Sequence, residues 1–119
     1  MDYEVPEEFD FFERGFGLSL EHDPDEALFS YIYRYENGQD LIFTHSPFSG
    51  NSVSVKLVTG KAEIFYLYLE GVASIAFQAW EQDKIIRIYF SYESTKELRV
   101  SYIFRSLSFI TRSSSPDFS

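Results

Sequence analysis

The sequence predicts a mainly β protein, an antiparallel sandwich or open barrel of about seven to eight strands with one short N-terminal helix. The chain is 19% aromatic, with thirteen Phe and nine Tyr, and aromatic side chains favour the pleated surface of a sheet. Apolar and polar residues alternate with a period of two through most of the chain. Turn-forming residues separate these runs at short intervals, and no long helical pattern follows residue 16.

The length of 119 residues fits one domain, residues 1–119, in which 113–119 form a loose polar tail. Cysteine is absent, so the chain has neither a disulfide scaffold nor a thiolate metal site. The acidic N-terminus does not resemble a signal peptide, and no apolar run is long enough to cross a bilayer. We therefore expect a cytoplasmic protein that does not associate with membranes.

The N-terminal helix is predicted over residues 7–14, with Pro6 at a position that suits a helix start and Gly15 and Gly17 at its end. Its apolar stripe is predicted to consist of Phe9, Phe12 and Phe16. A short strand follows at residues 17–21.

The next part of the chain predicts a loop and a hairpin. Residues 22–26 form the loop, because Pro24 and the neighbouring Asp residues favour turns. Residues 27–35 form a strand that places Phe29, Tyr31, Tyr33 and Tyr35 on one face, and the tyrosine row is either a binding face or one wall of the core. Asn37-Gly38 is a strong hairpin signal, so residues 41–46 are predicted to be the antiparallel partner.

The most apolar stretch, residues 61–92, is predicted to organise the sheet. Before it, residues 52–59 alternate as a half-buried strand. Residues 64–69 are apolar on both faces, which predicts a strand near the middle of a sheet and covered on both sides, or one that lies beneath a helix. A turn or bulge at Gly71-Val72 leads into a strand over residues 72–80.

Three C-terminal strands are predicted over residues 85–92, 98–105 and 107–112. In the first, the alternation places one row inward: Ile86, Ile88, Phe90 and Tyr92. Three arginines are predicted on the opposite faces of these strands: Arg87, Arg99 and Arg105. This basic surface is predicted to be solvated, and its arginines to pair with acids such as Glu97.

The negative charge of the chain is concentrated in its first third. Residues 1–40 contain twelve carboxylates and two arginines, whereas the remainder has a net charge of +1 and the whole chain −9. The negative net charge excludes a nucleic-acid-binding function, because such proteins need a basic surface. The acids either serve solubility and helix capping or form a surface that attracts a basic partner.

Catalytic and metal-binding patterns are weak. His22 with Asp23, Asp25 and Glu26 is the only local cluster of metal-binding residue types, and a solvated loop explains it better. His45 lies at a strand end without a nucleophile motif around it. We predict no enzyme, no catalytic residue, no metal and no cofactor. Trp80 is interpreted as a core residue, with ligand stacking as the alternative.

Residues 67–75 read Leu-Tyr-Leu-Glu-Gly-Val-Ala-Ser-Ile. This strand, Gly-Val and strand pattern, in a small acidic chain without cysteine, resembles the bacterial immunity proteins that neutralise toxins in contact-dependent competition. The resemblance implies a stoichiometric cytosolic inhibitor that blocks the active site of a cognate toxin. It assigns no functional residue.

The favoured interpretation is an immunity protein that binds a basic toxin, for example a nuclease, through acids of the first 40 residues. No particular oligomeric state is predicted. The predicted contact residues are Glu7, Glu8, Asp10, Glu13, Asp23, Asp25, Glu26, Tyr31, Tyr33 and Tyr35. A small-molecule-binding β-barrel with an aromatic-lined cavity is the alternative, and an enzyme using His22 or His45 is a third reading.

Overall fold

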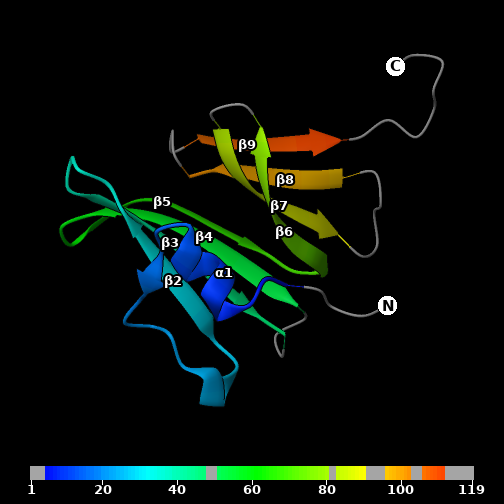
Figure 1. Cartoon of the computed structure of the whole chain (residues 1–119), viewed down its shortest axis with the longest axis horizontal. Coiled ribbons are helices and arrows are strands. Elements are labelled where there is room, and N and C mark those ends of the chain that lie inside the picture. Colours follow the sequence, from blue (N-terminus) through cyan, green and yellow to red (C-terminus); the bar gives the residue numbers. More distant parts are fainter. Residues whose placement is uncertain (1–4, 48–50, 81–82, 91–95, 103–105, 112–119) are drawn as a thin grey trace. The chain divides into compact units, whose positions relative to one another are not determined.

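The computed structural model describes residues 5–47, 51–80, 83–90, 96–102 and 106–111 (Figure 1). Within these ranges the chain forms nine strands, one α-helix and one 3-10 helix. The chain divides into two compact units, Pro6–Gly71 and Met1–Val5 with Val72–Ser119, and each unit contains one antiparallel sheet. The prediction of a mainly antiparallel β protein with one short N-terminal helix is confirmed.

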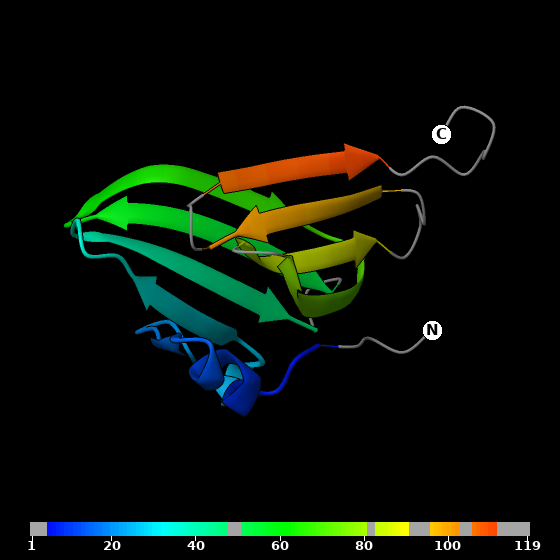
Figure 2. The same ribbon diagram turned by 45° about the horizontal axis from the view of Figure 1, so that its top comes forward.

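The unit Pro6–Gly71 contains a five-stranded sheet with the order β1-β2-β3-β4-β5 (Figure 2). Its elements are α1 (Glu8–Glu13), β1 (Gly17–Leu18), η1 (Pro24–Glu26), β2 (Phe29–Arg34), β3 (Gln39–Ser46), β4 (Ser52–Thr59) and β5 (Ala62–Leu69). The strand predicted over 17–21 is thus reduced to two residues, and the predicted loop contains η1. Every strand pairs antiparallel with the next one in sequence.

The hairpin predicted at Asn37-Gly38 joins β2 and β3. The backbone N–H of Tyr35 donates to the carbonyl oxygen of Gln39 (2.9 Å), and Gly38 has a φ of +89°, which glycine adopts without steric cost. The register that this turn sets pairs Tyr31 with Phe43 across the two strands. Local turn chemistry therefore fixes which aromatic rings meet in the core.

The helix α1 packs on the aromatic face of β2 and β3. Phe11 is completely buried, and its ring stacks on that of Tyr31 with centroids 3.8 Å apart. Phe16 is also buried, but Phe9 and Phe12 are 64% and 41% exposed. The predicted stripe was therefore wrong at those two positions, because the helix turns Phe11 toward the sheet.

Among the described strands, β5 lies at the edge of its sheet and pairs only with β4. The prediction of a central strand covered on both sides was wrong. The reason is that Gly71, with a φ of +76°, leads the chain out of this sheet, and the next strand pairs elsewhere. The predicted Gly-Val turn is thus a link between two sheets and not a hairpin.

The second unit contains a four-stranded sheet with the order β6-β7-β8-β9. Its strands are β6 (Val72–Trp80), β7 (Asp83–Phe90), β8 (Lys96–Ser101) and β9 (Ser106–Thr111). Six apolar residues of this sheet are buried: Ile75, Ile86, Ile88, Phe90, Leu98 and Val100. The predicted inward row is thereby confirmed at Ile86, Ile88 and Phe90. Tyr92, Arg105 and the side chain of Trp80 lie outside the described residues.

Both sheets have a linear strand order with two edges in the described part of the chain, so neither closes into a barrel. The open form removes the barrel on which the small-molecule alternative rested. No helix in the described ranges has the length and apolar character needed to cross a bilayer, since α1 has only six residues.

Candidate functional site

Four of the predicted contact acids belong to α1 and its N-cap. The backbone N–H of Glu7 donates to Oδ2 of Asp10 (2.8 Å), and the Glu7 side chain accepts from the backbone N–H of Asp10. This reciprocal pair satisfies two donors that a helix start otherwise leaves unpaired. Glu7, Glu8 and Glu13 are exposed, whereas Asp10 is half-buried. The capping pair therefore fixes the helix while most of its carboxylates face solvent.

The other three acids, Asp23, Asp25 and Glu26, lie at η1 and are all exposed. Backbone hydrogen bonds close this loop: the N–H of Asp23 donates to the oxygen of Leu28 (2.8 Å), and the N–H of Leu28 donates to the oxygen of Asp23 (2.9 Å). The bonds hold the three carboxylates on an ordered turn.

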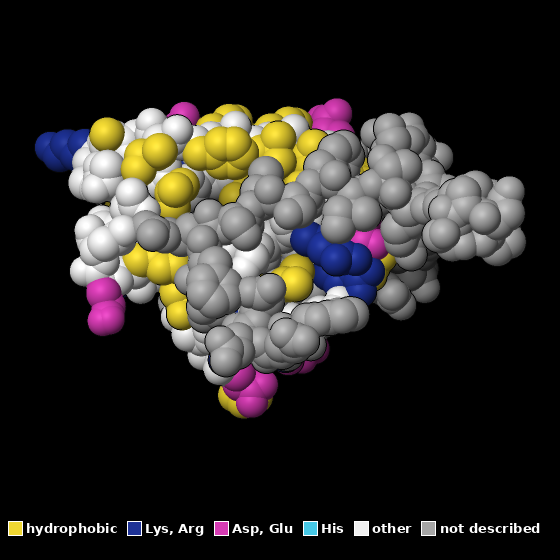
Figure 3. All heavy atoms as spheres, turned by 90° about the horizontal axis from the view of Figure 1, so that it is seen from above, with side chains coloured by type: hydrophobic (Ala, Val, Ile, Leu, Met, Phe, Trp, Pro, Cys, Tyr) yellow, Lys and Arg dark blue, Asp and Glu magenta, His cyan; other side chains and the backbone are white. Residues whose placement is uncertain are grey.

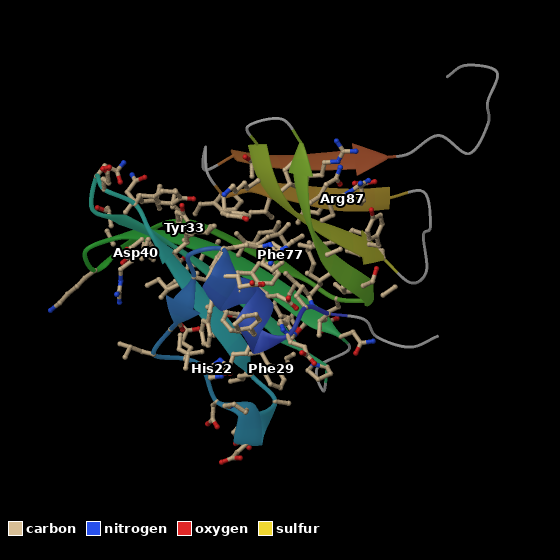
Figure 4. The ribbon with its side chains drawn as sticks, viewed as in Figure 1. His22, Phe29, Tyr33, Asp40, Phe77 and Arg87 are labelled. Carbon is tan, nitrogen blue, oxygen red and sulfur yellow. The ribbon has the colours of Figure 1, made fainter. Side chains whose placement is uncertain are left out.

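His22 connects η1 to α1 (Figure 4). Its Nδ1 accepts a hydrogen bond from the backbone N–H of Ser30 (3.0 Å), and its Nε2 lies 3.2 Å from Oε2 of Glu8. The second contact has the distance of an ion pair but not the alignment of a hydrogen bond. Since Nδ1 is an acceptor, Nε2 carries the proton and faces the carboxylate. His22 therefore joins the segment that carries η1 to the helix that carries the other acids.

We call the acids of α1 and η1 the acidic surface, which consists of Glu7, Glu8, Asp10, Glu13, Asp23, Asp25 and Glu26. Among the described residues, none of them forms an ion pair with Lys or Arg, and Glu8 contacts only His22. Arg14 donates to the backbone oxygen of Asp10 (2.9 Å), and Lys56 pairs with Glu21 (2.9 Å) instead. The described lysines and arginines thus leave the charge of this surface uncompensated by ion pairs.

The tyrosine row of β2 is divided by α1. Tyr31 is only 2% exposed beneath Phe11, so it is a core residue and cannot be an exposed contact. Tyr33 and Tyr35 are half-buried, with ring centroids 5.2 Å apart. A Cβ on Gly15 would come within 3.2 Å of the Tyr33 ring, which places that ring beside the end of α1. Two of the three predicted tyrosines therefore remain accessible.

An aromatic cluster beneath α1 brings the two histidines close to the same rings. His45 is buried and stacks on Phe29 at 5.1 Å, while His22 lies 6.1 Å from Phe29. Burial, with a smaller effect from His22, lowers the pKa of His45 to about 4. Burial, and to a lesser degree the charge of Glu8, raises the pKa of Tyr31 to about 12. Both groups are therefore neutral at pH 7, as core residues usually are.

The metal site considered for His22 and its acidic neighbours does not form. In the described ranges, no group of three or more His, Asp or Glu side chains is arranged to hold a metal ion.

The second unit carries a separate polar cluster on the face opposite its core. Glu97 is fully buried and accepts hydrogen bonds from Arg87 (2.9 Å to each carboxylate oxygen) and from Arg99 (2.9 Å). Burial would raise the pKa of Glu97, but the hydrogen bonds and charges of the arginines outweigh it and hold that pKa below its usual value. Arg87 also contacts Gln78 and lies over the ring of Tyr89. The predicted pairing with Glu97 is confirmed for Arg87 and Arg99, but the prediction of a solvated face was wrong there, because Glu97 is buried and Arg87 is half-buried.

Sequence reasoning did not find Phe11 or the contact between His22 and Glu8. Both depend on how α1 is laid on β2, and the sequence has no local signal for that placement. Comparisons with known protein families, characterised proteins and solved structures found no match. The fold and the acidic surface define the class only as a small antiparallel β protein with an exposed, negatively charged helix and turn.

Proposed function

We propose that this chain is a protein-binding module whose acidic surface docks on a cation-rich protein. The observation that supports the proposal is that the carboxylates of α1 and η1 are mostly exposed and form no ion pair with Lys or Arg in the described residues. A basic toxin, with a nuclease as the leading example, is the partner class that the resemblance to immunity proteins favours. In that role the chain is a stoichiometric inhibitor.

The physical basis is electrostatic attraction from a pre-ordered surface. A concentrated negative field increases the rate of encounter with a positive partner and disfavours partners of like charge. The capping pair of α1 and the backbone bonds at η1 already order the acids, so binding loses little conformational entropy. Tyr33, beside the end of α1, offers an aromatic contact with a polar tip next to the charged groups.

The competing explanation is that the acids serve solubility and helix capping alone. Capping accounts for Glu7 and Asp10, and the contact with His22 accounts for Glu8. Neither capping nor the His22 contact accounts for Glu13, Asp25 and Glu26, which are exposed and form no ion pair in the described part of the chain, so solubility is the role that the competing explanation leaves for them. These three residues therefore separate the two explanations.

The test uses immobilised full-length protein and a lysate of the source organism at low salt. A three-acid variant carries Glu13→Gln, Asp25→Asn and Glu26→Gln. A control variant with the same change in charge carries Glu36→Gln, Glu63→Gln and Glu70→Gln, all exposed residues outside the acidic surface. We expect the wild type and the control to retain a basic protein that the three-acid variant loses. Equal retention by all three proteins, or retention of no basic protein, would contradict the proposal.

A further inference from the structure

The edge strand β5 exposes apolar side chains on both of its faces. The exposed fractions are 50% for Ile64, 40% for Phe65, 50% for Tyr66 and 45% for Tyr68. Within the part of the chain that the structure describes, β5 pairs with β4 alone. Figure 3 shows an extended band of hydrophobic side chains at the surface of the molecule. Long apolar edge strands are normally blunted by charge, proline or a bulge, because their open backbone groups recruit other strands.

In β5 such protection is confined to the start of the strand. The register with β4 shifts where Val58 pairs with Glu63 and Leu57 pairs with Phe65, so Ile64 is an extra residue there. Beyond this bulge, residues 65–69 pair regularly with β4 and read Phe-Tyr-Leu-Tyr-Leu, without charge, proline or glycine. We call residues 65–69 the edge segment. Its regular geometry suits the addition of another strand.

The edge segment is complementary to an antiparallel copy of itself. Tyr66 and Tyr68 share one face, while Phe65, Leu67 and Leu69 share the other, because they pair with alternate residues of β4. A two-fold axis through Leu67 would pair Phe65 with Leu69 of the second copy and Tyr66 with Tyr68 of the second copy. Every such pair joins residues of the same face, which antiparallel pairing requires.

The charges at the ends of β5 favour the antiparallel arrangement. Lys61 precedes the strand and Glu70 follows it, where Glu70 accepts a hydrogen bond from the Tyr68 hydroxyl (2.9 Å). Antiparallel pairing brings Lys61 of one copy toward the end that carries Glu70 of the other. Parallel pairing in register would instead place identical charges side by side, which is destabilising.

We propose that the edge segment is a homodimer interface, in which two β5 strands pair antiparallel about Leu67 and join two sheets into one. A closed two-fold contact of this kind uses the same surface in both copies. It goes beyond the proposed function and does not depend on it, because the acidic surface consists of residues of α1 and η1, whereas the edge segment belongs to β5. Failure of one proposal therefore leaves the other intact.

The first test measures self-association of the full-length chain by sedimentation velocity over a wide range of concentration. Tyr66→Lys places a charge on an exposed position of the edge segment. Leu20→Lys is the control, because it places the same charge on a fully exposed apolar residue outside the edge segment. We expect a concentration-dependent dimer in the wild type and in Leu20→Lys, and a dissociation constant raised about tenfold or more by Tyr66→Lys. A wild type that remains monomeric throughout, or an unchanged dimer in Tyr66→Lys, would overturn the proposal.

A second test does not depend on the stability of the lysine variant. The chain has no cysteine, so a single introduced thiol can form a disulfide only between two copies. Leu67→Cys lies on the proposed axis, whereas Asn37→Cys lies in the exposed turn between β2 and β3. We expect oxidation to convert the first variant to a covalent dimer much faster than the second. Equal rates would contradict the proposed interface.

Discussion

Phe11 is the residue through which α1 is attached to the sheet. Its ring stacks on Tyr31 at 3.8 Å and meets Phe16 edge-on at 5.6 Å. Stacked and edge-to-face arrangements add to the free energy gained by burying aromatic area. Phe11, completely buried, therefore dominates the packing of α1, while its neighbour Phe9 remains mostly in solvent.

We expect Phe11→Ala to lower the free energy of unfolding by about 3–5 kcal/mol, because it leaves a cavity between α1 and β2. Phe9→Ala is the matched control in the same helix, and its effect should be below about 0.5 kcal/mol. Urea unfolding monitored by circular dichroism measures both. Similar losses for the two variants would show that α1 is oriented differently.

His45 makes stability depend on pH. Its pKa falls from 6.5 in the unfolded chain to about 4 in the folded protein, so between these values the unfolded state binds the extra proton. Stability is therefore highest above pH 6.5 and is lost as the pH falls toward 4. At about 1.4 kcal/mol per pKa unit, the loss is roughly 3 kcal/mol.

The variant His45→Phe keeps a ring against Phe29 but cannot bind a proton. We expect its free energy of unfolding to fall much less than that of the wild type between pH 6.5 and pH 4. Unfolding midpoints in urea across this range provide the measurement. If both proteins lose the same stability, His45 is not the group responsible.

Glu97 stabilises the second unit through its two arginines. Its pKa is lowered in the folded protein, so this stabilisation is present above the unfolded value of 4.5 and is lost as the pH falls through the folded value. Glu97→Gln should cost about 1–3 kcal/mol at neutral pH, moderated because Arg99 is partly exposed.

Chemical unfolding of Glu97→Gln at neutral and acidic pH measures this cost, with the exposed Glu63→Gln as the control. The difference from the wild type should shrink in acid. A difference that is the same at both pH values would argue against ionised Glu97 as its source.

Individual residues could be assigned from the sequence where a period of two applied. Ile86 and Ile88 were predicted to point inward and Arg87 outward, as the structure shows. Phe11 could not be assigned in this way, because six helical residues are too few to define a face. Its burial depends on the contact with β2, a strand that lies far along the chain.

At the scale of elements, the turn after α1 depends on Gly15. This residue has a φ of +94°, and a Cβ there would lie 3.2 Å from the Tyr33 ring. Alanine at this position would be strained in its backbone and crowded in its side chain. The glycine therefore allows the chain to reverse from α1 into β1.

Gly15→Ala should lower the free energy of unfolding by about 1–3 kcal/mol. Gly17→Ala is the control, because a Cβ at Gly17 meets no atom within 4 Å and its φ is not positive. Differential scanning calorimetry should give a clearly lower Tm for the first variant only. Equal shifts in Tm would contradict the role assigned to Gly15.

Strands and turns were predictable because their signals are local. Asn37-Gly38 predicted the hairpin of β2 and β3, and alternation predicted β4 with the bounds that the structure has. The position of β5 was not predictable, since an apolar run can be a buried central strand or an exposed edge. Whether the strand is central or at an edge depends on whether the segment after Gly71 pairs with it, and the residues of the strand itself do not determine that pairing.

At the scale of the whole molecule, charge is the feature that the sequence described best. The excess of acids in the first third of the chain was read directly from composition, and in the structure most of the acids of α1 and η1 are exposed. The link between them, His22 with Glu8, required coordinates, because the two residues are brought together only by folding. The acidic surface and the β5 edge are separate features of the Pro6–Gly71 unit.

The proposed function is tested most directly by the association rate constant with the captured basic partner, measured against ionic strength. The screening length falls from about 10 Å at 0.1 M salt to about 3 Å at 1 M, so attraction by exposed carboxylates weakens steeply. We predict a rate that falls strongly with salt in the wild type, and a slower, less salt-dependent rate in the variant with Glu13→Gln, Asp25→Asn and Glu26→Gln. A wild-type rate indifferent to salt, or the same salt dependence in both proteins, would contradict a docking role for the acidic surface.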